Sequence, residues 1–311
     1  MLKDVYTLLD LQNGLDSQPP IRLAVFGDPI AHSKSPQMHN FALEKCGIPA
    51  LYTRFLIKPE ELAEALRLLP GNDFIGVNLT IPHKRAALSL LDKIDPNALK
   101  IGAVNTVSIE NGKRIGYNTD GPGLVRAIRS EFGVDIRDLR VMVLGAGGGA
   151  GRAISVQCAL EGCERLVLVN RTLEKAEALA GELQPYFKGP HIGGPVARLE
   201  ALAMEDSRLK FQLQNTDLII NATSVGMKLS DPSPLPASIL LPHLMVFDTI
   251  YTASRTPLLR AADEVGARGV NGFSMLLYQG ALAFEIWFNR EAPLEGMRSA
   301  LVGTTFPASR N

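Results

Sequence analysis

The segment Val143–Ala153 reads VLGAGGGAGRA and lies near the middle of the chain. The apolar residues before the glycines predict a buried strand, and Arg152–Leu160 has the pattern of a helix. Gly145, Gly147 and Ala150 fit the loop that binds dinucleotides, in which small residues permit a tight turn, a close approach to pyrophosphate and close helix packing. The following helix N-terminus offers free N–H groups to phosphate. We therefore predict a nucleotide-binding loop formed by Gly145, Ala146, Gly147, Gly148, Gly149 and Ala150.

Composition and charge limit the class of protein. The chain has 311 residues, of which 46% are hydrophobic and 21% charged, and its formal net charge is zero. These values are typical of a soluble globular protein with one large or two ordinary domains. The neutral charge argues against nucleic acid or a membrane surface as a partner, and we expect no membrane span and no signal peptide. Cys46, Cys158 and Cys163 lack metal-binding spacing, so we expect reduced thiols, no metal site and a cytoplasmic protein.

Strand and helix patterns alternate along the chain, which predicts an α/β fold. Residues 1–20 are expected to form a short helix and a linker, Asn111-Gly112 a hairpin turn, and Lys188–Pro195 and Leu229–Pro236 surface loops. The predicted strands are Arg22–Phe26, Tyr52–Ile57, Phe74–Leu79, Ala103–Ile109, Arg114–Tyr117, Arg140–Leu144, Arg165–Val169, Asp217–Asn221 and Met245–Thr249. The predicted helices are Pro36–Lys45, Pro59–Leu69, Lys84–Leu91, Gly123–Phe132, Ala150–Leu160, Leu173–Leu183, one beginning at Thr256-Pro257, Met275–Phe288 and Pro293–Leu301.

The strand after the glycine loop ends in Asn170-Arg171-Thr172, which bears on the choice of dinucleotide. Sites for NAD usually have an acidic residue there, which accepts hydrogen bonds from the ribose hydroxyls. Arg171, with Lys175 one helical turn later, instead suits a 2′-phosphate. The alternative is that Arg171 is an ordinary exposed arginine.

Polar residues in the first third of the chain form a second candidate site. The hydroxyls of Ser33 and Ser35, before a predicted helix, could bind a carboxylate, although Ser35 could also be a simple N-cap. Asn78 and Thr80 lie at the carboxyl end of a strand, where α/β proteins bind ligands. Lys84 stands near a helix start, where a cation is unfavourable by ~0.3–1 kcal/mol, so a function would explain it, with a surface lysine as the alternative.

Asn105 and Asp120 follow at the ends of two further strands. Asp120 precedes a predicted helix, so it could serve as an N-cap. If the fold brings Asp120 and Lys84 together, the two groups could share a proton, as a general acid/base near neutral pH requires.

Taken together, these segments resemble the shikimate dehydrogenase family over nearly the whole chain, from about Arg22 to Asn289. The matching segments, in chain order, are FGDPIAHSKSPQMHN, GVNLTIPHK, GAVNT, GYNTDGPG, LGAGGGAGRA, VNRT, NATSVGM, TPLL and GFSMLLYQGALAFEIW. Their number and order make the resemblance far more specific than the glycine loop alone.

The resemblance implies a role for individual residues around the substrate. The carboxylate of shikimate would contact Ser33, Ser35 and Tyr251, and the ring hydroxyls would contact Thr80, Asn105, Asp120 and Gln279. Lys84 and Asp120 would be the catalytic pair. In this reaction Lys84 would give a proton to the carbonyl oxygen of 3-dehydroshikimate as hydride arrives from NADPH.

On the cofactor side, the resemblance implies NADP. Its pyrophosphate would lie against Gly145–Ala150, and its 2′-phosphate against Asn170, Arg171, Thr172 and Lys175. The nicotinamide half would lie near Thr223, Gly272 and Met275. Lys175 stands where many relatives have a second arginine, which would soften the preference for NADP. Thr252–Arg255 and Ser274 also depart from the usual pattern and could alter cofactor affinity or domain closure.

The implied architecture has two domains. A substrate domain would comprise residues 1–119 and 272–311, with residues 1–20 as an N-terminal extension, and a Rossmann-type doubly wound NADP domain would comprise residues 120–271. The active site would be a cleft between them. Monomer and homodimer both remain open. So do a quinate/shikimate dehydrogenase paralogue that uses NAD or both cofactors, and a non-catalytic NADP-binding sensor.

Overall fold

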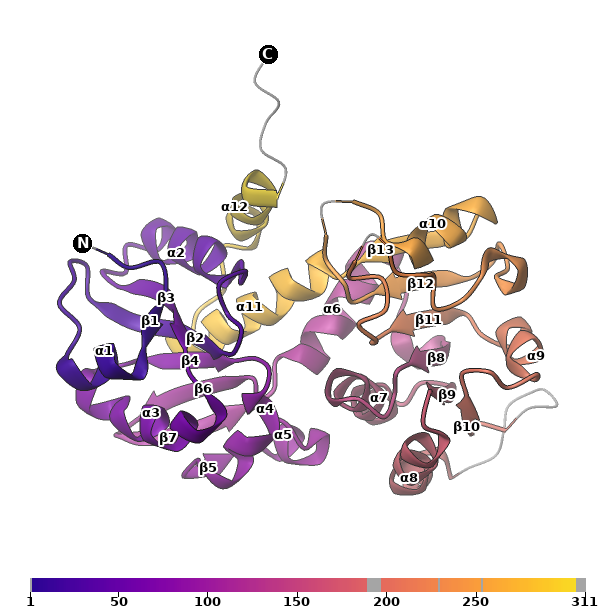
Figure 1. Ribbon diagram of the computed structural model, residues 1–311, viewed down its shortest axis with the longest axis horizontal. Helices are drawn as coiled ribbons and strands as arrows, with labels where there is room; N and C mark the ends of the chain where they lie inside the picture. Colours follow the sequence, from indigo (N-terminus) through magenta and orange to yellow (C-terminus); the bar gives the residue numbers. More distant parts are fainter. Residues whose placement is uncertain (1, 189–196, 229, 253, 306–311) are drawn as a thin grey trace, which may run out of the picture. The chain divides into compact units, whose positions relative to one another are not determined.

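Seven strands form the sheet of the first unit, in the order β1-β3-β2-β4-β6-β7-β5 (Figure 1). The neighbouring strands β1, β3, β2 and β4 are parallel, β6 is antiparallel to β4 and β7, and β5 is parallel to β7. Their bounds are β1 (Tyr6–Thr7), β2 (Ile21–Gly27), β3 (Leu51–Leu56), β4 (Gly76–Leu79), β5 (Lys93–Ile94), β6 (Thr106–Glu110) and β7 (Lys113–Tyr117).

The computed structural model describes residues 2–188, 197–228, 230–252 and 254–305. The chain divides into one unit of Met1–Gly123 with Leu276–Asn311 and another of Leu124–Met275. Both divisions fall a few residues beyond the predicted positions 119/120 and 271/272, inside helices α6 (Asp120–Phe132) and α11 (Phe273–Phe288). Most of the predicted loop Lys188–Pro195, together with Leu229 and Ala253, lies outside the described residues.

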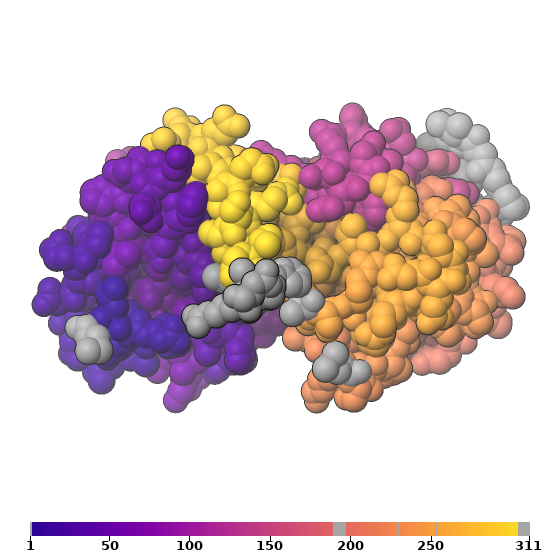
Figure 2. Space-filling model, turned by 90° about the horizontal axis from the view of Figure 1, so that it is seen from above, coloured from indigo at the N-terminus to yellow at the C-terminus, as the bar shows by residue number. Residues whose placement is uncertain are grey.

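The helices of the first unit follow the predicted pattern, except for two breaks and for α5 (Pro96–Ile101), which was not predicted. The segments Pro59–Glu61 and Ala87–Ser89 are 3-10 turns beside shorter helices, so the two helices predicted there were too long. Helix α12 lies against α2, which Figure 2 shows as yellow beside purple. The helices are α1 (Leu8–Asn13), α2 (Ser35–Lys45), α3 (Leu62–Leu68), α4 (His83–Ala86), α5 (Pro96–Ile101) and α12 (Leu294–Thr305).

The N-terminal segment is more than the predicted helix and linker. The helix is present as α1, but β1 also pairs with β3 and extends the sheet. Tyr6 stacks on Phe55, with ring centroids 5.4 Å apart, and Leu11 is buried in the same core. A strand of two residues is too short to show an alternating pattern, so sequence reasoning missed it.

The predicted hairpin turn is confirmed. Asn111 and Gly112 both have positive φ, 52° and 74°, and they join antiparallel β6 to β7. Two successive residues with positive φ make the turn that matches the twist of paired strands, and Asn-Gly tolerates it best.

The second unit has a six-stranded parallel sheet in the order β10-β9-β8-β11-β12-β13. Counted along the chain from β8, this is the doubly wound order 3-2-1-4-5-6. Its strands are β8 (Arg140–Leu144), β9 (Arg165–Asn170), β10 (Leu199–Ala203), β11 (Leu218–Asn221), β12 (Met245–Asp248) and β13 (Arg268–Asn271). Its helices include α7 (Gly149–Glu161), α8 (Leu173–Leu183), α9 (Leu209–Gln214) and α10 (Pro257–Glu264).

Central and edge strands differ in how well the sequence predicts them. The central strands β8, β9, β11 and β12 are apolar and almost completely buried, as expected where helices cover both faces of a parallel sheet. All four were predicted. The edge strands β10 and β13 are mostly half-buried and lack an apolar run, so they were not predicted.

All three cysteines are free thiols. Cys158 and Cys163 are fully buried at the end of α7, and burial raises the pKa of the Cys163 thiol to about 12. Cys46, at the C-cap of α2, is half-buried. The two buried thiols are therefore packing residues that stay protonated at neutral pH.

Candidate active site

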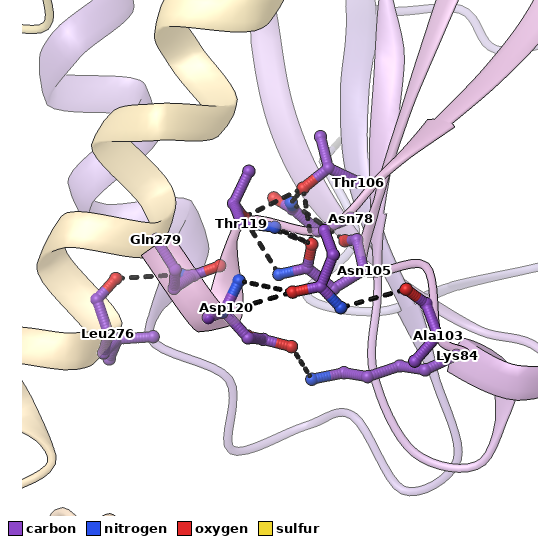
Figure 3. Close-up of polar contacts among 11 residues, drawn as sticks. Asn78, Lys84, Ala103, Asn105, Thr106, Thr119, Asp120, Leu276 and Gln279 are labelled. Atoms are coloured by element: carbon purple, nitrogen blue, oxygen red, sulfur yellow. Dashed lines mark hydrogen bonds and ion pairs between the residues drawn. The ribbon is translucent and has the colours of Figure 1, made fainter. Parts of the chain in front are cut away.

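Lys84 and Asp120 form an ion pair in the first unit. The Nζ atom of Lys84 lies 2.7 Å from Oδ2 of Asp120 (Figure 3). Lys84 comes from the first turn of α4 and Asp120 from the first residue of α6. Their side chains are 32% and 15% exposed, so a ligand can reach the pair. The fold therefore brings together the two residues predicted to share a proton.

Asn118, rather than Asp120, caps helix α6. Its Oδ1 accepts hydrogen bonds from the backbone N–H groups of Asp120, at 3.1 Å, and Gly121, at 3.2 Å. Its Nδ2 donates to the backbone oxygen of Ala103 at 3.0 Å. The N-cap alternative for Asp120 is therefore wrong, and its carboxylate is free to pair with Lys84. An asparagine two residues before a helix start is a signal that could have identified this residue.

A buried network of hydroxyl and amide groups lies beside the pair (Figure 3). The side chain of Asn105 accepts from the backbone N–H of Thr119 at 2.7 Å and donates to its hydroxyl at 2.9 Å. Asn78 donates to the Thr106 hydroxyl at 3.0 Å and accepts from the Tyr52 hydroxyl at 2.8 Å. Asn105, which is predicted to contact the substrate, thus also fixes Thr119, the residue before Asp120.

The two serines of the first unit have different environments. Ser35 is the first residue of α2 and is buried, and its side chain makes no capping bond because the N-cap position falls on Lys34. The N-cap alternative for Ser35 is therefore wrong. The Ser33 hydroxyl accepts from the backbone N–H of Ser35 at 3.4 Å and is half-buried.

The other predicted substrate residues are placed as follows. Thr80 is half-buried just beyond β4, with its backbone N–H bonded to the oxygen of Phe26 at 2.9 Å. Gln279 is largely buried on α11 and donates to the backbone oxygen of Leu276 at 2.8 Å. A Cβ on Gly123 would lie 2.8 Å from the backbone nitrogen of Gln279, so the first turn of α6 packs directly on α11. Tyr251, in the second unit, is 42% exposed.

The second unit contains a cavity of about 430 Å³ at the carboxyl ends of β8, β9, β10 and β11. Strand order reverses between β8 and β11, and this switch point is where open α/β sheets bind ligands. The cavity is lined by Gly145, Gly147, Gly148, Asn170, Arg171, Thr172, Lys175, Met204, Glu205, Ala222, Thr223, Ser224 and Val225. Among the predicted cofactor residues, Ala146, Gly149, Ala150, Gly272 and Met275 do not line it.

The glycine loop has the expected conformation, but one role was misplaced. Gly145 has φ of +80°, and a Cβ on Gly147 would lie 2.6 Å from Cβ of Lys175. The close packing of the helix on the strand depends on Gly151, where a Cβ would lie 2.0 Å from the backbone oxygen of Gly145. Ala150 is exposed, so its assignment to that packing was wrong.

Asn170, Arg171 and Lys175 play different parts at the cavity. Asn170 holds the glycine loop against the end of β9. Its Oδ1 accepts a hydrogen bond from the backbone N–H of Gly147 at 3.3 Å, and its Nδ2 donates to the backbone oxygen of Thr172 at 2.8 Å. Arg171 and Lys175 are exposed, and within the described ranges neither forms an ion pair. Two cations that form no ion pair with any residue the structure describes therefore line one cavity.

A buried carboxylate that sequence reasoning missed supports the opposite wall. Thr223 donates its hydroxyl proton to Oδ1 of Asn221 at 2.7 Å, and Asn221 donates to Asp248 at 3.0 Å. Asp248 also accepts from Thr256 at 2.6 Å, and burial raises the pKa of its carboxyl group. Thr256 caps α10 as predicted, since its side chain accepts from Leu259 N–H.

Gly272 and Met275 lie in the second unit and are not among the residues that line the cavity. A Cβ on Gly272 would lie 2.1 Å from the backbone oxygen of Thr249, so glycine is required there for close packing. The neighbouring Ser274 is buried, and its hydroxyl has no hydrogen-bond partner among the described residues. In the described part of the chain, no cluster of His, Cys, Asp and Glu could hold a metal ion, and no helix has the length and apolarity to cross a membrane.

Three segments of the chain match protein families. Residues 25–107 match the shikimate dehydrogenase substrate binding domain, residues 126–231 match shikimate / quinate 5-dehydrogenase, and residues 272–302 match the shikimate 5'-dehydrogenase C-terminal domain. A shikimate dehydrogenase (NADP(+)) of Methanopyrus kandleri is 41% identical over 282 residues, which cover 90% of this chain and 94% of that protein.

Solved structures extend the similarity to the fold. Shikimate 5-dehydrogenase of Thermus thermophilus, in complex with NADP(H) and shikimate, is 39% identical with a TM-score of 0.76 and covers 90% of this chain and 98% of its own. The enzyme of Listeria monocytogenes, in complex with shikimate and NAD, is 35% identical with a TM-score of 0.80 and covers 90% and 96%. Sequence and fold agree over nearly the whole length, and the chain belongs to the shikimate dehydrogenase family.

Proposed function

We propose that this protein catalyses the reversible, NADP-dependent reduction of 3-dehydroshikimate to shikimate, with Lys84 and Asp120 as the acid–base pair. The observation that carries the proposal is the 2.7 Å contact between the two side chains, together with the capping of α6 by Asn118, which leaves the Asp120 carboxylate available. In this proposal the first unit is the substrate domain and the second is the cofactor domain.

The cavity of the second unit has the chemistry that NADP requires. The glycine loop at the start of α7 offers backbone N–H groups to the pyrophosphate, and a side chain on Gly147 would fill the space beside Lys175. Arg171 and Lys175 offer two positive charges to a 2′-phosphate, and no carboxylate ends β9 to bind a ribose hydroxyl in the manner of NAD sites. NADPH bound there supplies the hydride.

The residues of the first unit would handle substrate and proton. Ser33 and Ser35 bind the carboxylate, while Thr80, Asn105, Asp120 and Gln279 hold the ring hydroxyls. In the direction of reduction, the Lys84 ammonium donates a proton to the carbonyl oxygen as that oxygen gains negative charge, which yields the alcohol. Asp120 holds Nζ in place through its charge-assisted hydrogen bond. In oxidation, neutral Lys84 accepts the alcohol proton.

The reaction belongs to the cytoplasm in this proposal, which is consistent with the three free cysteines. The experiment that tests the proposal is an assay of four combinations, shikimate and quinate each with NADP and NAD, followed by the absorbance of the reduced cofactor. We expect the highest kcat/KM for shikimate with NADP. A higher value for quinate or for NAD would replace the proposal with the paralogous activity, and no turnover in any combination would favour a sensor.

A further inference from the structure

Arg54 lies behind the loop that carries Ser33 and Ser35. It comes from β3, where Tyr52 and Arg54 point to one face of the sheet and Phe55 to the core on the other face. The Arg54 side chain is only 11% exposed. A mostly buried arginine needs hydrogen-bond acceptors for its N–H groups, and the acceptors that it contacts indicate its structural role.

The guanidinium group of Arg54 holds the backbone of Ser33. Its Nε and Nη2 both donate to the carbonyl oxygen of Ser33, at 3.0 Å and 2.8 Å. This two-point contact fixes the peptide that follows Ser33, and the side chain on the same residue is thereby oriented. The planar fork of arginine is what allows two donors to reach one acceptor, and lysine lacks it.

The charge of Arg54 is only weakly neutralised. Its ion-pair partner is Asp4, which lies 2.9 Å from Nη1 and has a side chain that is 83% exposed. Water screens so exposed a carboxylate strongly. The remaining partners are uncharged oxygens, the carbonyl of Ser33 and the side chain of Gln37. The loop that bears the two serines therefore has a positive charge directly behind it.

We propose that Arg54 is a positioning residue for the substrate carboxylate, which orients Ser33 through its carbonyl and adds a positive charge behind the carboxylate-binding serines. This inference rests on the proposed function, because it assumes that Ser33 and Ser35 face the carboxylate. Arg54 does not touch the reacting atoms, so its effect falls on substrate affinity rather than on the chemical step.

The test compares an acid with its neutral ester. The KM for shikimate and the inhibition constant of shikimate methyl ester are measured for the wild type, Arg54→Met and Arg54→Lys. Arg54→Met should raise the KM for shikimate by about tenfold, the size of one charge-assisted contact, while the KM for NADP and kcat change little. The inhibition constant of shikimate methyl ester should change much less, because the ester carries no charge. Arg54→Lys should retain most of the preference for the acid.

Arg22→Met is the matched control. Arg22, on the neighbouring strand β2, also donates to a backbone oxygen and pairs with a carboxylate, both belonging to Asp73 at 2.9 Å. Arg22→Met should leave the ratio of the KM for shikimate to the inhibition constant of the ester unchanged. An equal loss of acid and ester in Arg54→Met would mean a merely structural role, and no loss would remove any role; either result overturns the inference. A wild type that neither binds nor oxidises shikimate would overturn the proposed function first.

Discussion

The Oδ1 atom of Asn118 accepts a hydrogen bond from the backbone N–H of Asp120 at 3.1 Å, and this contact fixes the residue whose carboxylate pairs with Lys84. One amide thereby performs the capping that the carboxylate would otherwise provide. Asn118→Ala should lower the free energy of unfolding by about 1 kcal/mol, as the loss of an N-cap usually does, and should also lower kcat. Denaturant unfolding and steady-state kinetics measure the two effects. Asn118→Ser keeps a capping oxygen, so its stability and kcat should lie between those of the wild type and Asn118→Ala. Wild-type kcat in Asn118→Ala would contradict the link between the cap and catalysis.

Lys84 is expected to matter for the chemical step. Lys84→Met keeps the length of the side chain but removes its proton, so kcat should fall by on the order of 10² to 10⁴, the usual contribution of a general acid/base. The Kd for NADP, measured by cofactor fluorescence, should remain within about twofold, since Lys84 belongs to the other unit. Near-normal kcat in this variant would remove Lys84 from the proposed mechanism.

Arg171 is expected to recognise the 2′-phosphate of the cofactor. Arg171→Ala should weaken the binding of NADP(H) by ~1.5–3 kcal/mol, the range for hydrogen bonds to charged groups, and should hardly affect NAD(H). Titration calorimetry with both cofactors gives the comparison. Arg129→Ala serves as the control, because Arg129 is an exposed arginine of the same unit paired with Asp135. Equal weakening of both cofactors would show that Arg171 does not distinguish them.

Two glycines of α7 should respond in opposite ways to alanine. In Gly151→Ala the new Cβ meets the backbone oxygen of Gly145 at 2.0 Å, so we expect a loss of about 1–3 kcal/mol in unfolding free energy. In Gly149→Ala the Cβ meets nothing within 4 Å, and alanine favours helix, so stability should be equal or slightly higher. The melting temperatures of the two ligand-free variants, compared with that of the wild type, test this prediction. Equal losses would contradict the assigned packing role of Gly151.

His39 makes the stability of the protein depend on pH. It is fully buried and stacks on Tyr52, and burial lowers its pKa from 6.5 to about 3. Between these two values the unfolded chain binds a proton that the folded protein does not. The free energy of unfolding should therefore fall by about 1.4 kcal/mol per unit as pH decreases below 6.5. His39→Phe keeps the stacking and should flatten this part of the profile in denaturant unfolding; an unchanged slope would assign it to other groups.

The sequence predicted the central elements of both sheets because buried parallel strands are continuous apolar runs, and the hairpin because Asn111-Gly112 suits positive φ. It could not predict β1, β5, β10 or β13, which gain their structure by pairing at sheet edges and not from their own pattern. For the site, residue types and spacing were sufficient to select Lys84, Asp120 and Arg171. The role of Arg54 depends on a contact with the distant Ser33, which spacing along the chain does not reveal. The roles of Asn118 and Gly151 come from local contacts at the starts of α6 and α7 that sequence reasoning missed.

The distribution of thiols in this fold has a practical consequence for measuring ligand binding. Cys158 and Cys163 are buried and protonated, so a maleimide dye added to the native protein should react at Cys46. Cys46 ends α2, the helix that begins with Ser35. The natural protein thus offers one attachment point for a fluorophore, with no cysteine replacement needed, and that fluorophore would sit at the end of α2 opposite to the proposed substrate residue Ser35.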